Sequence, residues 1–421
     1  MENPKYSSVS LQSDAERAQT DAPQCETGRW KCETAPWKWW RSQMPIAKTW
    51  AYFDHAAVAP LSGPAATAIT QFADQASRQG DTVWPTWADS NEKLRRNAAR
   101  LLGCESKEIA LIPNTTAGIN FVAEGWDWKP GDNVVIPEGE FPSNLFPWMN
   151  QQSRGVELRI VPRRQSKHGE THEVNVADLV DAMDDSTRIV AASWVGYASG
   201  YRLDVAELVR QSHERGVLVF LDAIQGLGMY PLDLKKTPVD FLAADGHKWL
   251  LGPEGAGLAM IRREHFGKLR LGNIGWGSVK NSYNYAEPKM DLRNEAARYE
   301  SGSANMVGLA GLSASLDIFL AVLDHHGADA IEQRVVGLAT ELDQKLRAMG
   351  VKTSLAADRE NQSSIVNFRL DGTEPAKIRE RGLEQNVVLS CRGSGVRASV
   401  HAYNNEEDLD RLVAVVKSFR S

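Results

Sequence analysis

Cysteine is scarce in this sequence, and so is net charge. Four cysteines in 421 residues do not form the disulfide framework on which small secreted domains depend, so we expect a reduced, cytoplasmic protein. The formal net charge of −6, with no basic patch interleaved with aromatics, argues against a nucleic-acid partner. A structural metal site needs a second ligand pair near the N-terminal cysteines, and none is found, so no metal is expected.

Long uninterrupted apolar stretches are also missing. Residues Met1–Arg17 are polar and lack the apolar run of a signal peptide. The most apolar later stretch, Val307–Leu323, is interrupted by Asp317 and by serines, which is typical of an amphipathic helix in a folded protein. We therefore expect no membrane-spanning segment.

The length of the chain predicts more than one domain. We expect a flexible, polar extension over residues 1–33 and an N-terminal segment over 34–68 that packs with a small domain. A large domain is expected over 69–304 and a small α+β C-terminal domain over 305–421.

Short apolar runs alternate with helical patterns from residue 109 onward, which predicts a mostly parallel sheet covered on both faces by helices. The seven expected strands are 109–112, 134–136, 158–161, 189–192, 217–221, 241–243 and 258–261. Expected helices include 176–183 and 205–214, followed in the small domain by strands at 365–368 and 396–400 and helices at 375–381 and 406–417.

Lys248 is the residue around which the other motifs are organised. It follows the apolar run Phe241–Ala244 and precedes the turn Gly252–Gly255. A lysine at the end of a buried strand can be neutral and nucleophilic, as bonding an aldehyde cofactor requires. From this stretch alone, an ordinary loop lysine is equally compatible.

Two further strand ends carry polar groups, where open α/β sheets bind ligands. Thr115 and Thr116 begin a helix after the strand ending at Ile112, so they are candidate phosphate contacts, although simple N-capping is the alternative. Asp222 ends five apolar residues and needs a partner. A protonated pyridine nitrogen would be such a partner, and a helix N-cap is the alternative role.

These motifs together resemble the class V aminotransferases and cysteine desulfurases, which are pyridoxal-phosphate (PLP) enzymes of fold type I. The segment Gly246-His247-Lys248 with Gly252-Pro253-Glu254-Gly255 is similar to the family's cofactor-lysine segment, and the similarity extends from about Tyr52 to the C-terminus. The resemblance implies a seven-stranded large domain, PLP bound to Lys248, and Asp222 on the ring nitrogen.

The resemblance also implies roles for residues in other segments. Those implied for the cofactor are Phe141 against the ring, Gln225 at the phenolic oxygen, His247 beside Lys248, and Ser303 on the phosphate of a partner in a homodimer. Those implied for an amino-acid substrate are Arg397 on the α-carboxylate, with Arg392, His55 and Tyr197 as further contacts. The chain departs from desulfurases at Phe141, where they carry histidine, at Tyr197, where they carry asparagine, and at Asp245, where they carry a serine or similar residue.

The resemblance leaves the reaction type open, because several reactions share the removal of the Cα proton by Lys248 and differ only in the later steps. A desulfurase needs a cysteine on a flexible loop ahead of Arg397, but Cys391 lies in an apolar pattern that predicts the end of a strand. We therefore favour an aminotransferase. A cysteine or selenocysteine lyase and an amino-acid epimerase are the alternatives, and a non-catalytic binding protein is disfavoured because Lys248, Asp222 and Arg397 are all present.

Overall fold

The computed structural model describes residues 35–165 and 172–420. The predicted extension over residues 1–33 lies outside this range. The strands are β1 Ala51–Tyr52, β2 Ile109–Ile112, β3 Asn133–Pro137, β4 Glu157–Val161, β5 Arg164–Gln165, β6 His172–Glu173, β7 Thr187–Ser193, β8 Leu218–Asp222, β9 Phe241–Asp245, β10 Gly257–Ile261, β11 Lys352–Thr353, β12 Ile365–Arg369, β13 Val387–Val388, β14 Ser390–Arg392 and β15 Gly395–Ser399. The α-helices are α2 Pro36–Ser42, α3 Gly63–Gln79, α4 Trp84–Leu102, α5 Thr115–Ala123, α6 Phe146–Asn150, α7 Val176–Asp181, α8 Val205–Glu214, α9 Met306–His326, α10 Ala330–Ala348, α11 Pro375–Glu384 and α12 Glu406–Lys417.

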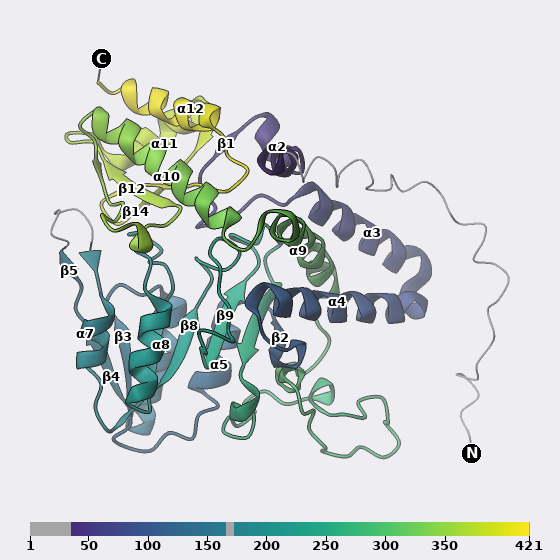
Figure 1. Cartoon of the computed structure of the whole chain (residues 1–421). Helices are drawn as coiled ribbons and strands as arrows, with labels where there is room; N and C mark the ends of the chain where they lie inside the picture. The colour runs from purple at the N-terminus through teal and green to yellow at the C-terminus, as the bar shows by residue number, and fades with distance from the viewer. Residues whose placement is uncertain (1–34, 166–171, 421) are drawn as a thin grey trace.

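A seven-stranded sheet, in the order β2-β10-β9-β8-β7-β3-β4, forms the centre of the large domain (Figure 1). The pairs β3–β4, β3–β7, β7–β8 and β8–β9 are parallel, whereas β10 runs antiparallel to both of its neighbours. The predicted fold type I architecture and its seven strands are confirmed, with shifts of one or two residues at the strand ends.

Both faces of this sheet are buried, because alternate residues of each strand point into different apolar layers. In β7, Val190 and Ala192 pack with α7, α8 and α9, whereas Ile189 and Ala191 pack with α5 and α6. This explains why the sequences of the strands are continuous apolar runs and do not alternate between apolar and polar residues.

The small domain has its own four-stranded antiparallel sheet, in the order β11-β12-β15-β14. Figure 1 shows it with α10, α11 and α12 at one end of the larger sheet. Its apolar core is distinct from those of the large domain. The N-terminal strand β1 pairs in parallel with β13, so residues near position 51 lie against the C-terminal part of the chain. The predicted domain boundaries stay predictions.

Helix α9 combines length with a largely apolar sequence. It is long and apolar enough to cross a membrane by length and composition alone, but 61% of its most apolar window is buried inside the protein. It packs against α3 and α4, as a core helix of a folded protein does.

Candidate active site

Lys248 lies in the turn that follows β9. Its side chain is buried, and burial lowers its pKa to about 8, against the opposing effect of Asp222, which favours the charged amine. Gly246 is required two residues earlier, because a Cβ there would lie 2.7 Å from the carbonyl oxygen of Ala256. The sequence therefore builds a tight turn that holds a readily deprotonated amine at the end of a buried strand.

Asp222 is the last residue of β8, next to β9 in the sheet, and it is buried. Burial raises the pKa of its carboxyl to about 6, partly offset by the N–H of Ile224, which donates to Oδ1 at 3.1 Å, and by the charge of Lys248. Few groups of the protein offset the cost of burying this carboxylate. It is therefore suited to a cationic partner, such as a protonated ring nitrogen.

Phe141 supplies an apolar face beside the lysine. Lys248 Nζ lies 5.4 Å from the centroid of the Phe141 ring, and the ring is 43% exposed. Tyr197 meets Phe141 edge to face, with ring centroids 5.3 Å apart. The exposed ring has room to stack on a flat cofactor, but a phenyl group cannot exchange protons.

The predicted phosphate cradle is next to the Lys248 turn. The hydroxyl of Thr115 accepts a hydrogen bond from the Asp245 N–H at 2.9 Å, and the Thr116 hydroxyl donates to Ser143 Oγ at 2.9 Å. The N-cap of α5 is Asn114, whose side chain accepts from the Ala117 N–H. The first N–H groups of α5 have no partner inside the helix and suit a phosphate, whereas the two hydroxyls already have protein partners.

The carboxylate of Asp245 points back toward its own turn. It accepts from the Gly246 N–H at 2.7 Å and lies 2.9 Å from His247 Nδ1. The carboxylate of Asp245 is therefore bound by groups of its own turn. This explains how an acidic residue can lie near a predicted phosphate site.

Gln225 is buried between the N-terminal segment and the Lys248 turn. Its Nε2 donates to the Ala56 carbonyl at 3.0 Å, and its Oε1 accepts from Trp249 Nε1 at 2.7 Å. These bonds fix the amide near the lysine and leave one Nε2 hydrogen for a cofactor oxygen.

Arg397 joins three parts of the chain. Its Nη1 donates to the Tyr197 carbonyl at 2.8 Å, and its Nη2 donates to Asp54 Oδ1 at 3.0 Å. Its buried Nε has no partner among the described residues. Burial lowers the pKa of this guanidinium. Arg392 is only half-buried and donates to the Cys391 carbonyl, while its charge contributes to the lowered pKa of Lys248.

His55 is buried at the junction of the N-terminal segment and the C-terminal strands. The side chain is fully buried, with Nδ1 2.8 Å from the Ser399 carbonyl and Nε2 2.7 Å from the Tyr403 hydroxyl. It belongs to a buried aromatic cluster with Trp249 and His401. Both ring nitrogens therefore have protein partners, and the expected substrate contact stays a prediction.

Ser303 is exposed in the loop that precedes α9. It lines a cavity of about 230 Å³ together with Pro113 and Ala117, at the start of α5. Lys248 and Asp222 are not among the lining residues of that cavity, so the structure does not bring Ser303 into contact with the lysine of its own chain.

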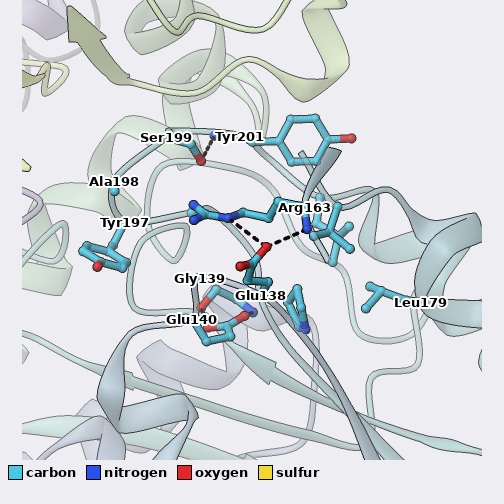
Figure 2. A pocket seen from close by; sticks show the side chains of 14 residues that line it. Glu138, Gly139, Glu140, Arg163, Leu179, Tyr197, Ala198, Ser199 and Tyr201 are labelled. Carbon is cyan, nitrogen blue, oxygen red and sulfur yellow. Dashed lines mark hydrogen bonds and ion pairs between the residues drawn. The ribbon is translucent and has the colours of Figure 1, made fainter. Parts of the chain in front are cut away.

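Glu140 is a site residue that the sequence interpretation did not single out. Both of its carboxylate oxygens bind Ser193, and burial followed by repulsion from Asp222 raises its pKa to about 7. Figure 2 shows Glu140 at the wall of a small cavity of about 60 Å³, together with Glu138, Arg163 and Tyr197. An acidic residue three positions after the end of β3 was the available signal.

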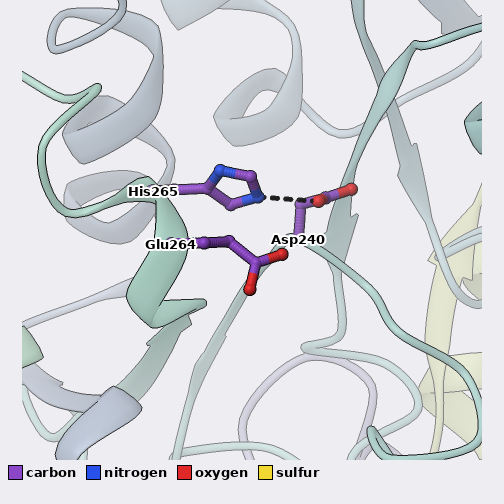
Figure 3. A group of neighbouring side chains, drawn as sticks. All are labelled: Asp240, Glu264 and His265. Carbon is purple, nitrogen blue, oxygen red and sulfur yellow. Dashed lines mark hydrogen bonds and ion pairs between the residues drawn. The ribbon is translucent and has the colours of Figure 1, made fainter.

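A second cluster of polar side chains lies at the opposite edge of the sheet, where β9 begins. Asp240 accepts from His265 Nε2 and from His213 Nε2, each at 2.8 Å, and Glu264 lies beside them (Figure 3). Asp240 also accepts from the Val219 N–H, and His265 Nδ1 is 3.1 Å from Lys268 Nζ. Hydrogen bonds within the protein account for this cluster without a metal ion.

The residues at the main site fit PLP. Lys248 offers a buried amine with a lowered pKa, Asp222 a buried carboxylate, Phe141 an open ring face, and the start of α5 a set of N–H groups. Together with the fold, this set defines a PLP-dependent enzyme of fold type I.

Comparison with known proteins gives the family. Residues 51–412 match the sequence pattern described as Aminotransferase class-V. A probable cysteine desulfurase of Methanothermobacter thermautotrophicus is 29% identical over 394 residues, covering 88% of this chain and 95% of that protein. A cysteine desulfurase of Dickeya dadantii is 32% identical over 347 residues, covering 77% of this chain and 79% of that protein. The chain belongs to the class V aminotransferase family, which confirms the predicted resemblance and the cofactor.

Solved structures agree with the fold. The cystine C–S lyase C-DES, in complex with its product cysteine persulfide, has a TM-score of 0.81 at 24% identity, covering 88% of this chain and 98% of that chain. At this level of identity the likeness is evidence for the fold.

Proposed function

We propose that this enzyme is a PLP-dependent C–S lyase, which eliminates a sulfur group from the β-carbon of a cysteine-like amino acid. Relatives named cysteine desulfurases support C–S cleavage. The observation that carries the proposal is the placement of Cys391, which supports elimination of sulfur instead of its transfer to an enzyme thiol.

Cys391 lies within β14 and pairs with Val396 of β15. Burial raises the pKa of its thiol, whereas a nucleophilic cysteine needs a lowered pKa and free access. The other cysteine of the described residues, Cys104, has a pKa raised to about 12, chiefly by burial. Neither thiol has the environment of a sulfur acceptor.

The chain's own residues then have defined roles. When PLP is bound, it supplies the electron sink that stabilises charge at Cα. Arg397 holds the α-carboxylate through its guanidinium, and Lys248 removes the Cα proton. Asp222 keeps the ring nitrogen protonated. Phe141, which lies beside Lys248, has no proton to donate, and this disfavours epimerisation, because inversion needs a second proton donor.

The overall reaction balances without an external oxidant. The Cα–H bond breaks with its proton on Lys248, and its electron pair forms the Cα–Cβ double bond. The Cβ–S bond breaks with its pair on the sulfur, which leaves as a thiol after protonation. Hydrolysis of the remaining three-carbon amine gives pyruvate and ammonia.

An aminotransferase is the second candidate. Lys248 is a buried base at the site. Transamination needs only one base, because the same group can carry the proton from Cα to the cofactor carbon. The absence of a suitably placed thiol among the described residues is equally compatible with this reaction.

We also propose that the enzyme is a homodimer with shared sites. Ser303 is exposed, and the nearby loop after β10 carries a set of exposed apolar side chains: Ile274, Trp276, Tyr283, Tyr285 and Met290. This loop packs against the Ser301 segment, since a Cβ at Gly275 would lie 2.2 Å from the Ser301 carbonyl. Exposed apolar surface of this kind suits a second copy of the chain.

The products distinguish the reactions. Purified enzyme with L-cysteine or L-cystine should release pyruvate and ammonia without added keto acid. Alanine with a protein-bound persulfide would instead indicate a desulfurase. Turnover that requires a keto acid and yields a new amino acid would indicate an aminotransferase. Either result would refute the elimination proposal.

A further inference from the structure

Glu140 connects two strand ends at the cofactor site. It follows β3 and precedes Phe141, the residue predicted to stack on the cofactor ring. Its Oε1 accepts from the Ser193 N–H at 2.7 Å, and its Oε2 accepts from the Ser193 hydroxyl at 2.5 Å. Because both oxygens bind the last residue of β7, the segment that carries Phe141 is fixed to the sheet.

Ser193 also places Glu140 beside Asp222. In the parallel pair β7–β8, Ser193 is in register with Asp222. The charge of Asp222 acts on the carboxyl of Glu140, and carboxyl groups that interact in this way do not ionise independently. Burial and the charge of Asp222 raise the pKa of Glu140 to about 7, whereas the pKa of Asp222 is raised to about 6. Burial disfavours two negative charges in this pair, and the nearby charge of Lys248 favours the ionised form of Asp222.

The other charged groups around the pair do not change this preference. Lys248, on the turn after β9, acts on Asp222 and favours its ionised form. Arg163 and Glu138 line the same cavity as Glu140, but the two pair with each other at 3.8 Å, and the Arg163 N–H donates to Glu138 (Figure 2). Within the described residues, Glu140 itself has no ion-pair partner.

We propose that Glu140 is a positioning residue for the cofactor. Through Ser193 it holds the Phe141 segment against the sheet, and as the proton-bearing member of the carboxyl pair it leaves the charge on Asp222 for the ring nitrogen. When Glu140 is protonated, its O–H donates to Ser193 Oγ in place of the reverse bond. This role concerns the PLP site and is independent of which reaction the enzyme catalyses.

The test uses holoenzyme reconstituted with PLP that is isotope-labelled at the ring nitrogen, and follows the NMR chemical shift of that nitrogen from acid to alkaline pH. In the wild type we expect a transition near pH 7 as Glu140 ionises. In Glu140→Gln, which keeps the shape but cannot ionise, this transition should be absent. In Ser193→Ala it should move to higher pH, because the lost hydroxyl bond favoured the ionised carboxylate.

Matched variants distinguish a positioning role of Glu140 from a general loss of folded structure. Glu138→Gln alters the same cavity without touching Ser193 and should keep the wild-type transition. Glu140→Ala should weaken PLP affinity about tenfold, because loss of the two bonds to Ser193 frees the Phe141 segment, and should reduce the circular dichroism of the bound cofactor. Far-ultraviolet circular dichroism should verify that each variant is folded. A wild-type transition in Glu140→Gln, or wild-type PLP affinity in Glu140→Ala, would overturn the proposal, whatever products the enzyme forms.

Discussion

Arg397 Nη2 donates to Asp54 Oδ1 across 3.0 Å, although the two residues are 343 positions apart in the sequence. The guanidinium that is predicted to bind the substrate carboxylate therefore already has a carboxylate partner, while its buried Nε has none among the described residues. A substrate would use Nε and share or replace the bond to Asp54.

Replacing Arg397 with alanine should lower kcat/KM by about two orders of magnitude, because a charge-assisted bond to the α-carboxylate is lost. Arg392→Ala is the matched control and should have a smaller effect, since Arg392 is half-buried and farther along the hairpin. Steady-state kinetics of both variants provides the measurement. Equal losses in the two variants would mean that Arg397 has no special part in carboxylate binding.

Lys248 should be the residue that carries the cofactor. Borohydride reduction of the holoenzyme, followed by peptide mass analysis, should locate the adduct on Lys248, since this buried amine has a pKa lowered to about 8 and is readily deprotonated. Lys248→Ala should give no adduct, whereas Lys236→Ala, at an exposed site, should label as the wild type does. An adduct on any other lysine would contradict the assignment.

Changing Cys391 to alanine should leave the products and their rates unchanged. The thiol lies in β14 and is protonated at neutral pH, so its loss removes only a small side chain and costs on the order of 1 kcal/mol in the free energy of unfolding. Product analysis with L-cysteine and thermal unfolding provide the two measurements. Loss of sulfur release in this variant alone would make the protein a desulfurase.

The proposed shared site predicts complementation between inactive chains. Lys248→Ala and Ser303→Glu should each be inactive, the second because a carboxylate repels the partner's phosphate. In a mixed dimer, one site combines the intact Lys248 of one chain with the intact Ser303 of the other, so an equal mixture should recover about a quarter of the wild-type activity. Sedimentation should show a dimer. No recovery after subunit exchange would argue that each chain forms its site alone.

The buried histidines predict acid sensitivity. Burial lowers the pKa of His401 to about 4, and the pKa of His55 lies well below 6.5. The unfolded chain therefore binds protons below about pH 6.5 that the folded chain does not. The free energy of unfolding should fall as pH drops from about 6.5 to about 4, by an amount on the order of 3 kcal/mol for His401.

Thermal unfolding at a series of pH values measures this effect. His55→Gln should flatten the dependence, whereas His325→Gln, at an exposed position near the end of α9, should leave it unchanged. A wild-type slope in the His55 variant would exclude His55 as a cause.

The sequence predicted the strands and the residues at their ends because those signals are local. Continuous apolar runs reveal buried strands; Asp222 comes directly after one such run, and Lys248 lies four positions after another. Contacts between distant segments could not be read in this way. The bonds from Glu140 to Ser193, the ion pair of Arg397 with Asp54 and the burial of His55 all depend on where separate strands meet, for which the sequence has no periodic signal.

The pairing of β1 with β13 sets an order of events during synthesis. Ala51 is opposite Val387 in this ladder and is synthesised long before it. The N-terminal strand therefore stays unpaired until the C-terminal part of the chain has been made. Contacts between such distant positions form late and slowly. Asp54, two residues beyond β1, therefore meets Arg397 only once the C-terminal strands have been made, so the arginine predicted to bind the substrate carboxylate acquires this partner at the end of synthesis.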